Sequence, residues 1–153
     1  MFDFNFSAAT EAQTASFGQR LAHMAHKGDC FALFGTLGMG KSVLARAFIQ
    51  SLCGEVDVPS PTFTLVQFYD APDFCIYHFD LYRLKSAEEI FELGMEEALY
   101  DGVSLIEWPD KMCGYLPKNC ARITITPQGS GRNINIQTSS SSLAERLSKE
   151  FCQ

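Results

Sequence analysis

The sequence predicts an α/β fold in which a mixed sheet of parallel and antiparallel strands is flanked by helices. First, residues 35–42 match the pattern G-x-x-x-x-G-K-[ST] at every specified position. Second, an apolar run at 30–34 precedes this loop and a helical pattern follows it, which is the order of a P-loop nucleotide-binding domain. Third, two pairs of strand-like segments are joined by turns so short that they favour antiparallel pairing. At 153 residues, we expect one domain, 1–153, with its own core.

The chain opens with a strand and then a helix. Phenylalanines alternate with polar residues over 2–6, so we expect a strand with one buried face. Thr10 and Gln13 have capping-box spacing and predict the start of a helix, which we expect to end near Gly28. The apolar side of this helix carries Phe17, Leu21 and Met24.

A glycine-rich loop joins the apolar strand to a helix expected from Lys41 to about Leu52, because Gly54 follows at a common helix stop. Such a loop wraps backbone N–H groups around nucleotide phosphates at the positive end of the helix. Lys41 is expected at the β- and γ-phosphates, and the Ser42 hydroxyl on Mg²⁺. The predicted phosphate-loop residues are Gly35, Thr36, Leu37, Gly38, Met39, Gly40, Lys41 and Ser42. The sequence therefore predicts a protein that binds a nucleoside triphosphate.

A loop and a hairpin come next. Prolines on both sides of Ser60 keep this loop extended. A hydroxyl in segment 60–63 can reach Mg²⁺ or the γ-phosphate, as in the switch loops of nucleotide hydrolases, although a structural turn is the default interpretation. Strand-like runs at 63–69 and 74–79 are separated only by the turn at 70–73, which predicts an antiparallel hairpin.

Residues 86–100 are helical and acidic, and we expect Gly94 to break this segment in two. A basic partner could bind the acidic face, but a solvated helix face explains it better. A buried strand follows at 103–106.

The last predicted elements are a hairpin and a helix. Isoleucines alternate with threonines around 123–125 and with Asn and Gln around 134–136, with a turn at 128–132 between them. Ser142 and Glu145 are expected to cap the final helix. Its apolar face carries Leu143, Leu147 and Phe151.

Two apolar strands end in acidic residues: Asp80 follows 74–79, and Glu107 follows 103–106. Ligands bind beyond the carboxyl ends of parallel strands, so either carboxylate can face a metal ion. Asp80, with the shorter side chain, suits contact with the metal or its water. Glu107 reaches further and suits activation of an attacking water. Exposed strand-end residues are the alternative interpretation.

Composition limits the classes of partner and compartment. The net charge is −6 with no lysine or arginine cluster, which argues against direct, non-specific binding of nucleic acid. No apolar stretch has the length that a bilayer requires and no leader pattern is present, so we expect a protein of the cytoplasm that does not enter a membrane. The six cysteines lack zinc-site spacing and are expected to be reduced. His23 and His26 are expected at the surface.

These motifs, in this order, resemble the TsaE (YjeE) family of small bacterial ATPases, which support threonylcarbamoyladenosine formation on tRNA. The resemblance runs from about Thr10 to Pro117, and the C-terminal residues carry little of it. The family usually has Asp where Thr36 stands, Ala at Met39 and Thr at Ser42. Ser42 keeps the metal-binding hydroxyl, whereas the other two changes bear on nucleotide affinity or loop packing. The resemblance rests on residues 35–42, Ser60-Pro61-Thr62-Phe63, the segment from His78 to Leu84, and Ile106-Glu107-Trp108-Pro109.

The resemblance implies an ATPase that is weak alone and uses ATP and Mg²⁺. It also implies work with the TsaB–TsaD complex, in which TsaD transfers the threonylcarbamoyl group to adenosine 37 of tRNA. The tRNA itself is then met only indirectly.

By motif match, Glu107 is the implied catalytic acid, with Lys41 acting at the phosphates. Val43 and Trp108 are assigned to the nucleotide site, whereas Tyr82 and Arg83 face either the nucleotide or the partner. The implied metal site consists of Ser42, Thr62, Asp80 and Glu107.

Two other functions remain open from the residues alone. A small-molecule kinase can use the same loop, but such kinases usually add an arginine-bearing lid, and the stretch between Asp110 and Lys118 has no arginine. A non-catalytic module whose shape depends on ATP is the second. A GTPase is disfavoured, since the chain has no N-K-x-D element for guanine.

Overall fold

The computed structural model describes residues 1–35 and 40–151, without the Cys113 side chain. Thr36, Leu37, Gly38 and Met39 of the predicted phosphate loop therefore lie outside the described residues. The strands are β1 (Phe2–Ala8), β2 (Cys30–Phe34), β3 (Val66–Asp70), β4 (Cys75–Asp80), β5 (Gly102–Glu107), β6 (Ala121–Gln128) and β7 (Gly131–Thr138). The α-helices are α1 (Glu11–Met24), α2 (Lys41–Cys53), α3 (Met95–Asp101) and α4 (Ser141–Phe151), and the 3-10 helices are η1 (Ala87–Leu93) and η2 (Pro109–Tyr115).

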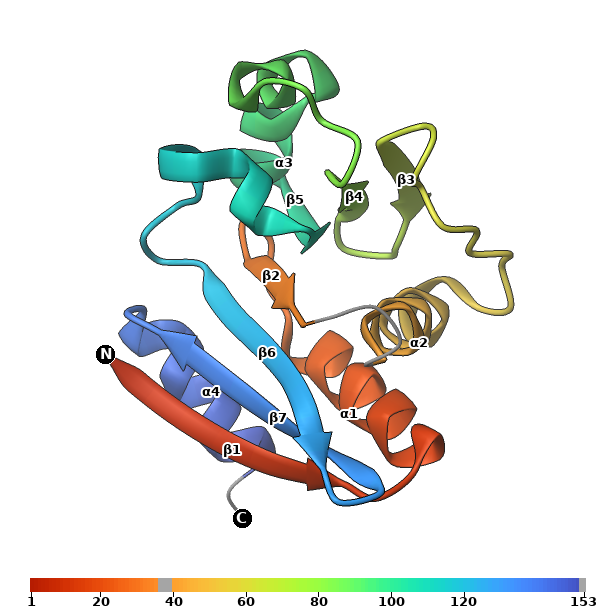
Figure 1. Cartoon of the computed structure of the whole chain (residues 1–153), viewed down its shortest axis with the longest axis vertical. Helices are drawn as coiled ribbons and strands as arrows, with labels where there is room; N and C mark the ends of the chain where they lie inside the picture. The colour runs from red at the N-terminus through yellow and green to blue at the C-terminus, as the bar shows by residue number, and fades with distance from the viewer. Residues whose placement is uncertain (36–39, 152–153) are drawn as a thin grey trace.

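The described strands form one sheet in the order β1-β7-β6-β2-β5-β4-β3 (Figure 1). β2 pairs parallel with β5 and β6, and β4 pairs parallel with β5. β1 with β7, β6 with β7 and β3 with β4 pair antiparallel. The predicted mixed α/β fold and both predicted hairpins are confirmed.

Parallel pairing brings the carboxyl ends of β2, β4 and β5 to one edge of the sheet. Leu33 of β2 and Asp80 of β4 both lie opposite Glu107 of β5 in the strand register. The helix that follows β2 begins at Lys41. Backbone pairing therefore holds the two strand-end acids and the start of α2 at the edge where ligands bind in open α/β sheets.

Helices cover both faces of the central strands. One buried cluster packs α1, α2 and α4 against the sheet residues Phe31, Leu33 and Leu105. The second packs η1, α3 and η2 against the opposite face, through Ala32 and Ile106. Successive residues of β2 and β5 thus point to opposite faces, as strand geometry requires. Burial on both sides explains why these strands are continuous apolar runs in the sequence.

The first helix begins where predicted and ends earlier. The Thr10 Oγ1 accepts a hydrogen bond from the Gln13 N–H at 3.2 Å, which caps the helix. The helix ends at Met24 rather than near Gly28, because the next residue is already extended. Gly28 has a φ of +94° and donates its N–H to the first residue of β5 at 2.7 Å. It belongs to the turn into β2, not to the helix.

Two further segments refine the prediction for the middle of the chain. β3 begins at Val66 rather than at residue 63, because Leu65 has a φ of +69° and donates its N–H to the Pro61 carbonyl at 2.7 Å. The acidic segment does break at Gly94, where φ is +84°, but its first half is the 3-10 helix η1. Residues 63–65, which the apolar pattern assigned to a strand, therefore belong to a turn.

The last helix is capped by Ser140 and not by the predicted Ser142 and Glu145. The Leu143 N–H donates to Ser140 Oγ at 3.2 Å, and the helix begins at Ser141. Ser142 already lies inside the first turn, so its hydroxyl does not occupy the capping position.

Three kinds of feature are absent from the part of the chain that the structure describes. No helix in it combines the length and hydropathy needed to cross a bilayer. No group of three or more His, Cys, Asp or Glu side chains gathers in it as a metal site, and His23 and His26 are exposed. The described cysteines are free thiols: Cys30, Cys53, Cys75 and Cys120.

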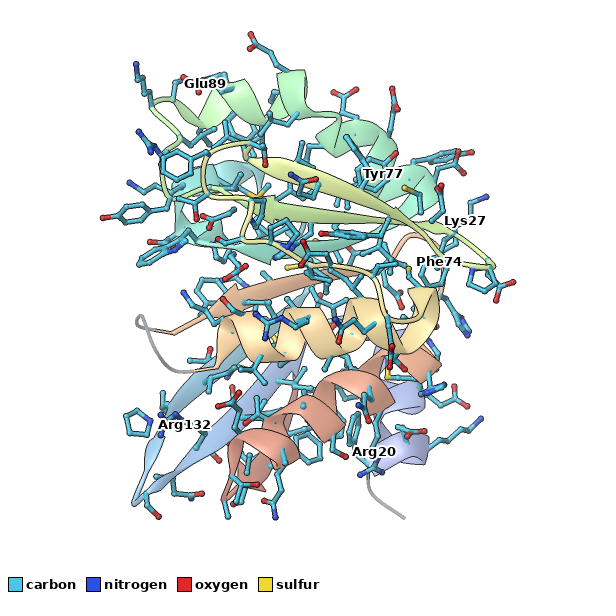
Figure 2. The ribbon with its side chains drawn as sticks, turned by 90° about the vertical axis from the view of Figure 1, so that its right-hand side faces the viewer. Arg20, Lys27, Phe74, Tyr77, Glu89 and Arg132 are labelled. Atoms are coloured by element: carbon cyan, nitrogen blue, oxygen red, sulfur yellow. The ribbon has the colours of Figure 1, made fainter. Side chains whose placement is uncertain are left out.

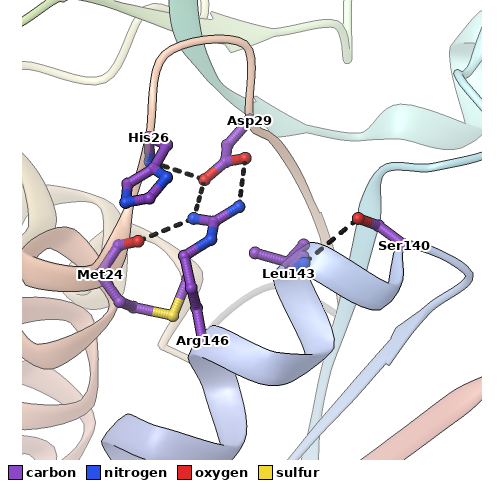
Figure 3. A network of polar contacts seen from close by, with 6 residues as sticks. All are labelled: Met24, His26, Asp29, Ser140, Leu143 and Arg146. Carbon is purple, nitrogen blue, oxygen red and sulfur yellow. Dashed lines mark hydrogen bonds and ion pairs between the residues drawn. The ribbon is translucent and has the colours of Figure 1, made fainter.

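A bidentate ion pair ties the C-terminal helix to the start of β2 (Figure 3). The Arg146 guanidinium donates to both oxygens of Asp29, at 2.6 and 2.9 Å, and to the Met24 carbonyl at 2.7 Å. Asp29 also accepts the His26 N–H at 2.8 Å. The two charged side chains are only 16% and 12% exposed. Removal of one partner would leave the other charge poorly solvated.

We therefore expect Arg146→Met to lower the free energy of unfolding by roughly 3 kcal/mol, because it strands the Asp29 carboxylate. Lys149→Met is the matched control: its pair with Glu145 is 75% and 68% exposed, so the change should stay within about 0.5 kcal/mol. Urea denaturation of the three proteins measures both values. Equal stabilities of the two variants would show that the ion pair does not anchor α4.

Candidate functional site

A cavity of about 520 Å³ opens at the carboxyl edge of β4 and β5, beside the start of α2. Its opposite wall consists of the β1–α1 junction and the turn between β6 and β7. Gly35, which directly follows β2, is not among the lining residues. The predicted site residues that line the cavity are Gly40, Lys41, Ser42, Val43, Thr62, Asp80, Glu107 and Trp108.

Lys41 is a buried cation that lines this cavity. Gly40 adopts a φ of +104° at the helix N-cap, a conformation that strains any side chain, and the next residue begins α2. The Lys41 side chain is buried, at 5% exposure. Its Nζ lies 4.2 Å from the centre of the Trp108 ring, and no described carboxylate forms an ion pair with it. The indole face therefore provides the electrostatic partner of a buried ammonium group.

Trp108 reaches Lys41 through an unusual backbone conformation. Its φ of +58° and ψ of +49° are left-handed, which costs a bulky residue free energy, and Pro109 begins η2 directly afterwards. The indole also packs against Tyr82, with ring centres 4.9 Å apart. The sharp turn after β5 thus returns the indole to the cavity, where Trp108 is one of the lining residues.

Asp80 is held by two donors. The Thr62 Oγ1 donates to Asp80 Oδ2 at 2.9 Å, and the backbone N–H of Tyr82 donates to Oδ1 at 3.0 Å. The Ser60 hydroxyl is 2.7 Å from Thr62 Oγ1. The loop that sequence analysis considered for Mg²⁺ or phosphate is therefore joined to Asp80 by hydroxyl groups.

Glu107 pairs with a residue to which the sequence assigned no role. Its Oε2 lies 2.7 Å from His78 Nε2, and both residues are buried. His78 lies two positions before Asp80 on β4, so both side chains are on one face of the sheet. This spacing was the signal available in the sequence, because a polar residue at that position interrupts the apolar strand.

The far wall of the cavity was also missed by sequence reasoning. The β6–β7 turn packs closely on the end of β1, because a side chain at Gly131 would meet the Ala8 carbonyl oxygen at 2.5 Å. Arg132 lies at the end of this hairpin (Figure 2). Contacts between opposite ends of the chain cannot be found from local patterns. The lining residues on this wall are Ala8, Ala9, Thr10, Glu11, Thr14, Ser130, Gly131 and Arg132.

The donor chemistry of the near wall fits a magnesium ion. Mg²⁺ prefers hard oxygen ligands and usually keeps some of its water. The oxygen donors here are the Ser42 and Thr62 hydroxyls and the Asp80 and Glu107 carboxylates, all lining one cavity. Both carboxylate oxygens of Asp80 already accept a hydrogen bond, from Thr62 and from the Tyr82 N–H. Asp80 therefore suits a position outside the metal's own ligands, where it orients a ligand or a water.

Comparisons with known proteins agree with the family resemblance found in the sequence. The family described as "Threonylcarbamoyl adenosine biosynthesis protein TsaE" matches residues 8–134 of this chain. The chain belongs to the TsaE family. The match extends beyond Pro117, where we expected the resemblance to end, and includes the cavity residues 130–132.

Individual relatives of the TsaE family agree with this assignment. The Rickettsia bellii protein named "tRNA threonylcarbamoyladenosine biosynthesis protein TsaE" is 46% identical over 71% of this chain and 76% of its own. The Bacillus subtilis protein of the same name is 33% identical over 76% of this chain and 73% of its own. The crystal structure of Bacillus subtilis YdiB superposes with a TM-score of 0.78 at 26% identity, over 97% of this chain and 95% of that one. The shared architecture therefore includes the C-terminal strands and helix.

We expect Mg-ATP to change the fluorescence of Trp108, because phosphates would draw the Lys41 ammonium away from the indole face. Trp108 is the only tryptophan in the chain, so the signal has a single source. A titration should give a saturable change whose midpoint equals the calorimetric dissociation constant. Lys41→Ala is the control and should abolish the response. A flat signal in the native protein, with binding shown by calorimetry, would remove Trp108 from the nucleotide site.

Proposed function

We propose that this chain is a Mg²⁺-dependent ATPase that acts with the TsaB–TsaD complex in forming threonylcarbamoyladenosine at position 37 of tRNA. Membership of the TsaE family supports the pathway. One observation supports the chemistry: Lys41 and Ser42 of the phosphate-loop helix share a cavity with Asp80 and Glu107. A cation, a metal-binding hydroxyl and two carboxylates in one place are the parts that phosphoryl transfer from a nucleotide requires.

Binding of ATP would use the start of α2. The helix N-terminus and Lys41 favour the phosphates, because both place positive charge at this point. Lys41 is already buried beside Trp108, so little new desolvation is needed when phosphates replace the indole as its partner. The far wall, from Ala8 to Glu11 and around Arg132, leaves room for the rest of the nucleotide.

Ser42, Thr62, Asp80 and Glu107 would hold Mg²⁺, directly or through its waters. The ion would neutralise charge on the phosphates and on the two carboxylates that face them. Asp80 keeps the Thr62 hydroxyl in place through a hydrogen bond of 2.9 Å, so a change at either residue should disturb the other.

Hydrolysis would use Glu107 as the group that orients the attacking water and accepts its proton. The water oxygen forms a bond to the γ-phosphorus while the bond to the β–γ bridging oxygen breaks, and ADP and phosphate leave. Resemblance to the TsaE family supports a slow reaction by the isolated chain and faster turnover with its partners. Phosphate release without any added acceptor distinguishes this reaction from that of a kinase.

The partner, rather than this chain, would contact tRNA. The net charge of −6 disfavours a direct electrostatic contact with the RNA backbone. Two exposed aromatic side chains would instead be available to contact a partner protein: Tyr82 is 53% exposed and Phe63 is 81% exposed. The Arg83 guanidinium lies 4.6 Å from the Phe63 ring centre. We also propose that the protein acts in the cytoplasm, together with the partner complex that would modify the tRNA.

We expect Glu107→Gln to bind Mg-ATP with a dissociation constant within about threefold of the native value, because the amide keeps an oxygen that can face the metal or its water. Hydrolysis should be slower by about 100-fold or more, since the amide cannot accept a proton from the attacking water. Lys41→Ala should show the opposite pattern and lose binding itself. Calorimetry and phosphate release, measured with the partner complex present, separate the two effects. Native hydrolysis by the Glu107 variant would overturn its assignment as the catalytic acid.

We expect ATP-dependent association with purified TsaB–TsaD and, with tRNA and a threonylcarbamoyl donor supplied, repeated rounds of adenosine modification. Lys41→Ala should lose both, because its complex cannot form around bound ATP. Association can be measured by size-exclusion chromatography and modification by mass spectrometry of digested tRNA. Tight binding of free tRNA at physiological salt would contradict the charge argument, and an ATP-independent complex would contradict the proposed role of the nucleotide.

A further inference from the structure

The contact between His78 and Glu107 joins the proposed catalytic acid to a residue outside the proposed nucleotide and metal contacts. His78 Nε2 lies 2.7 Å from Glu107 Oε2, and the side chains are 3% and 7% exposed. His78 does not line the cavity, whereas Glu107 does. The histidine therefore acts on the site only through the glutamate.

The histidine ring is costly for a residue that only fills the core. Its Nδ1 is buried and has no hydrogen-bond partner among the described residues. A buried polar atom without a partner costs about 1–3 kcal/mol, and an apolar side chain of similar size would avoid this cost. The same face of β4 does accommodate an apolar residue, because Ile76, two positions earlier, is fully buried there. Among the described residues, His78 makes its polar contact with Glu107.

We propose that His78 is a positioning residue that fixes the orientation of Glu107 for its work on the attacking water. The ring donates its Nε2–H to Oε2 of Glu107, which leaves Oε1 to accept a hydrogen bond from the water. A single donor to the carboxylate of a flexible side chain restricts its rotamers, as partners of catalytic carboxylates generally do. This inference rests on the proposed ATPase function.

The hydrogen bond can be tested without ATP. The chain has three histidines, and His23 and His26 are exposed, so their ¹⁵N side-chain signals can be assigned by substitution. We expect His78 to show the Nε2–H tautomer, with a ring proton protected from exchange that is lost or strongly shifted in Glu107→Gln. A Nδ1–H tautomer, or a signal that ignores the Glu107 substitution, would overturn the proposal whatever the ATPase assay shows.

The kinetic consequence is tested by two variants at one position. His78→Leu removes the donor, while His78→Gln keeps an amide N–H near the position of Nε2. We expect His78→Leu to slow hydrolysis by about 10- to 100-fold with unchanged affinity for Mg-ATP, and His78→Gln to recover most of the rate. His26→Gln, at an exposed position, is the matched control and should behave as the native protein.

A double substitution separates positioning from a general effect on the fold. In a Glu107→Gln background, His78→Leu should slow hydrolysis no further, because the carboxylate that it positions is absent. An equal loss in both backgrounds, a weakened affinity for ATP, or no rescue by Gln would overturn the proposal. Failure of the native protein to release phosphate with its partners would instead contradict the proposed function, and the NMR result would still decide the hydrogen bond.

Discussion

Parallel pairing of β2, β5 and β4 is the constraint on which the site depends. It sets Asp80 opposite Glu107 and places Lys41 beside them, so three charged groups are buried at one edge of the sheet. Burial of isolated charges is unfavourable unless each has a partner. Each has a different one here: Thr62 and a backbone N–H for Asp80, His78 for Glu107, and the Trp108 ring for Lys41. The surroundings of the site supply a polar or aromatic contact to each of these three charges.

Local patterns predicted most of the fold, because the apolar residues of this chain follow strand and helix periods closely. The glycine-rich loop located α2, and the strand-end acids followed from two apolar runs that finish at Asp80 and Glu107. The predicted helix boundary was wrong where several neighbouring residues could each form the cap. Ser139 to Ser142 all have the chemistry of a cap, and it is Ser140 that accepts the Leu143 N–H in the structure. Leu65 was assigned to a strand because it is apolar. Its left-handed backbone conformation cannot be recognised from the residue type.

The unpredicted half of the cavity depends on strand order. β1 lies at one edge of the sheet beside β7, so Ala8 at its end meets Gly131 at the start of β7, from the opposite end of the sequence. A sequence without covariation data contains no local signal for this contact. His78 was missed for a different reason. Its position on the inward face was predictable, but its partner on β5 follows only from the parallel register that places Asp80 opposite Glu107.

Under the proposed function, this arrangement would require nucleotide and metal to bind together. Asp80 and Glu107 would face the triphosphate across a small, partly enclosed cavity, where low solvent screening strengthens repulsion between negative groups. Lys41 and the α2 N-terminus offset only part of this repulsion. A divalent cation held by the Ser42 and Thr62 hydroxyls would convert the carboxylates from repulsive neighbours into ligands. Free ATP without Mg²⁺ would therefore bind weakly, and loss of Mg²⁺ after hydrolysis would favour release of the remaining nucleotide.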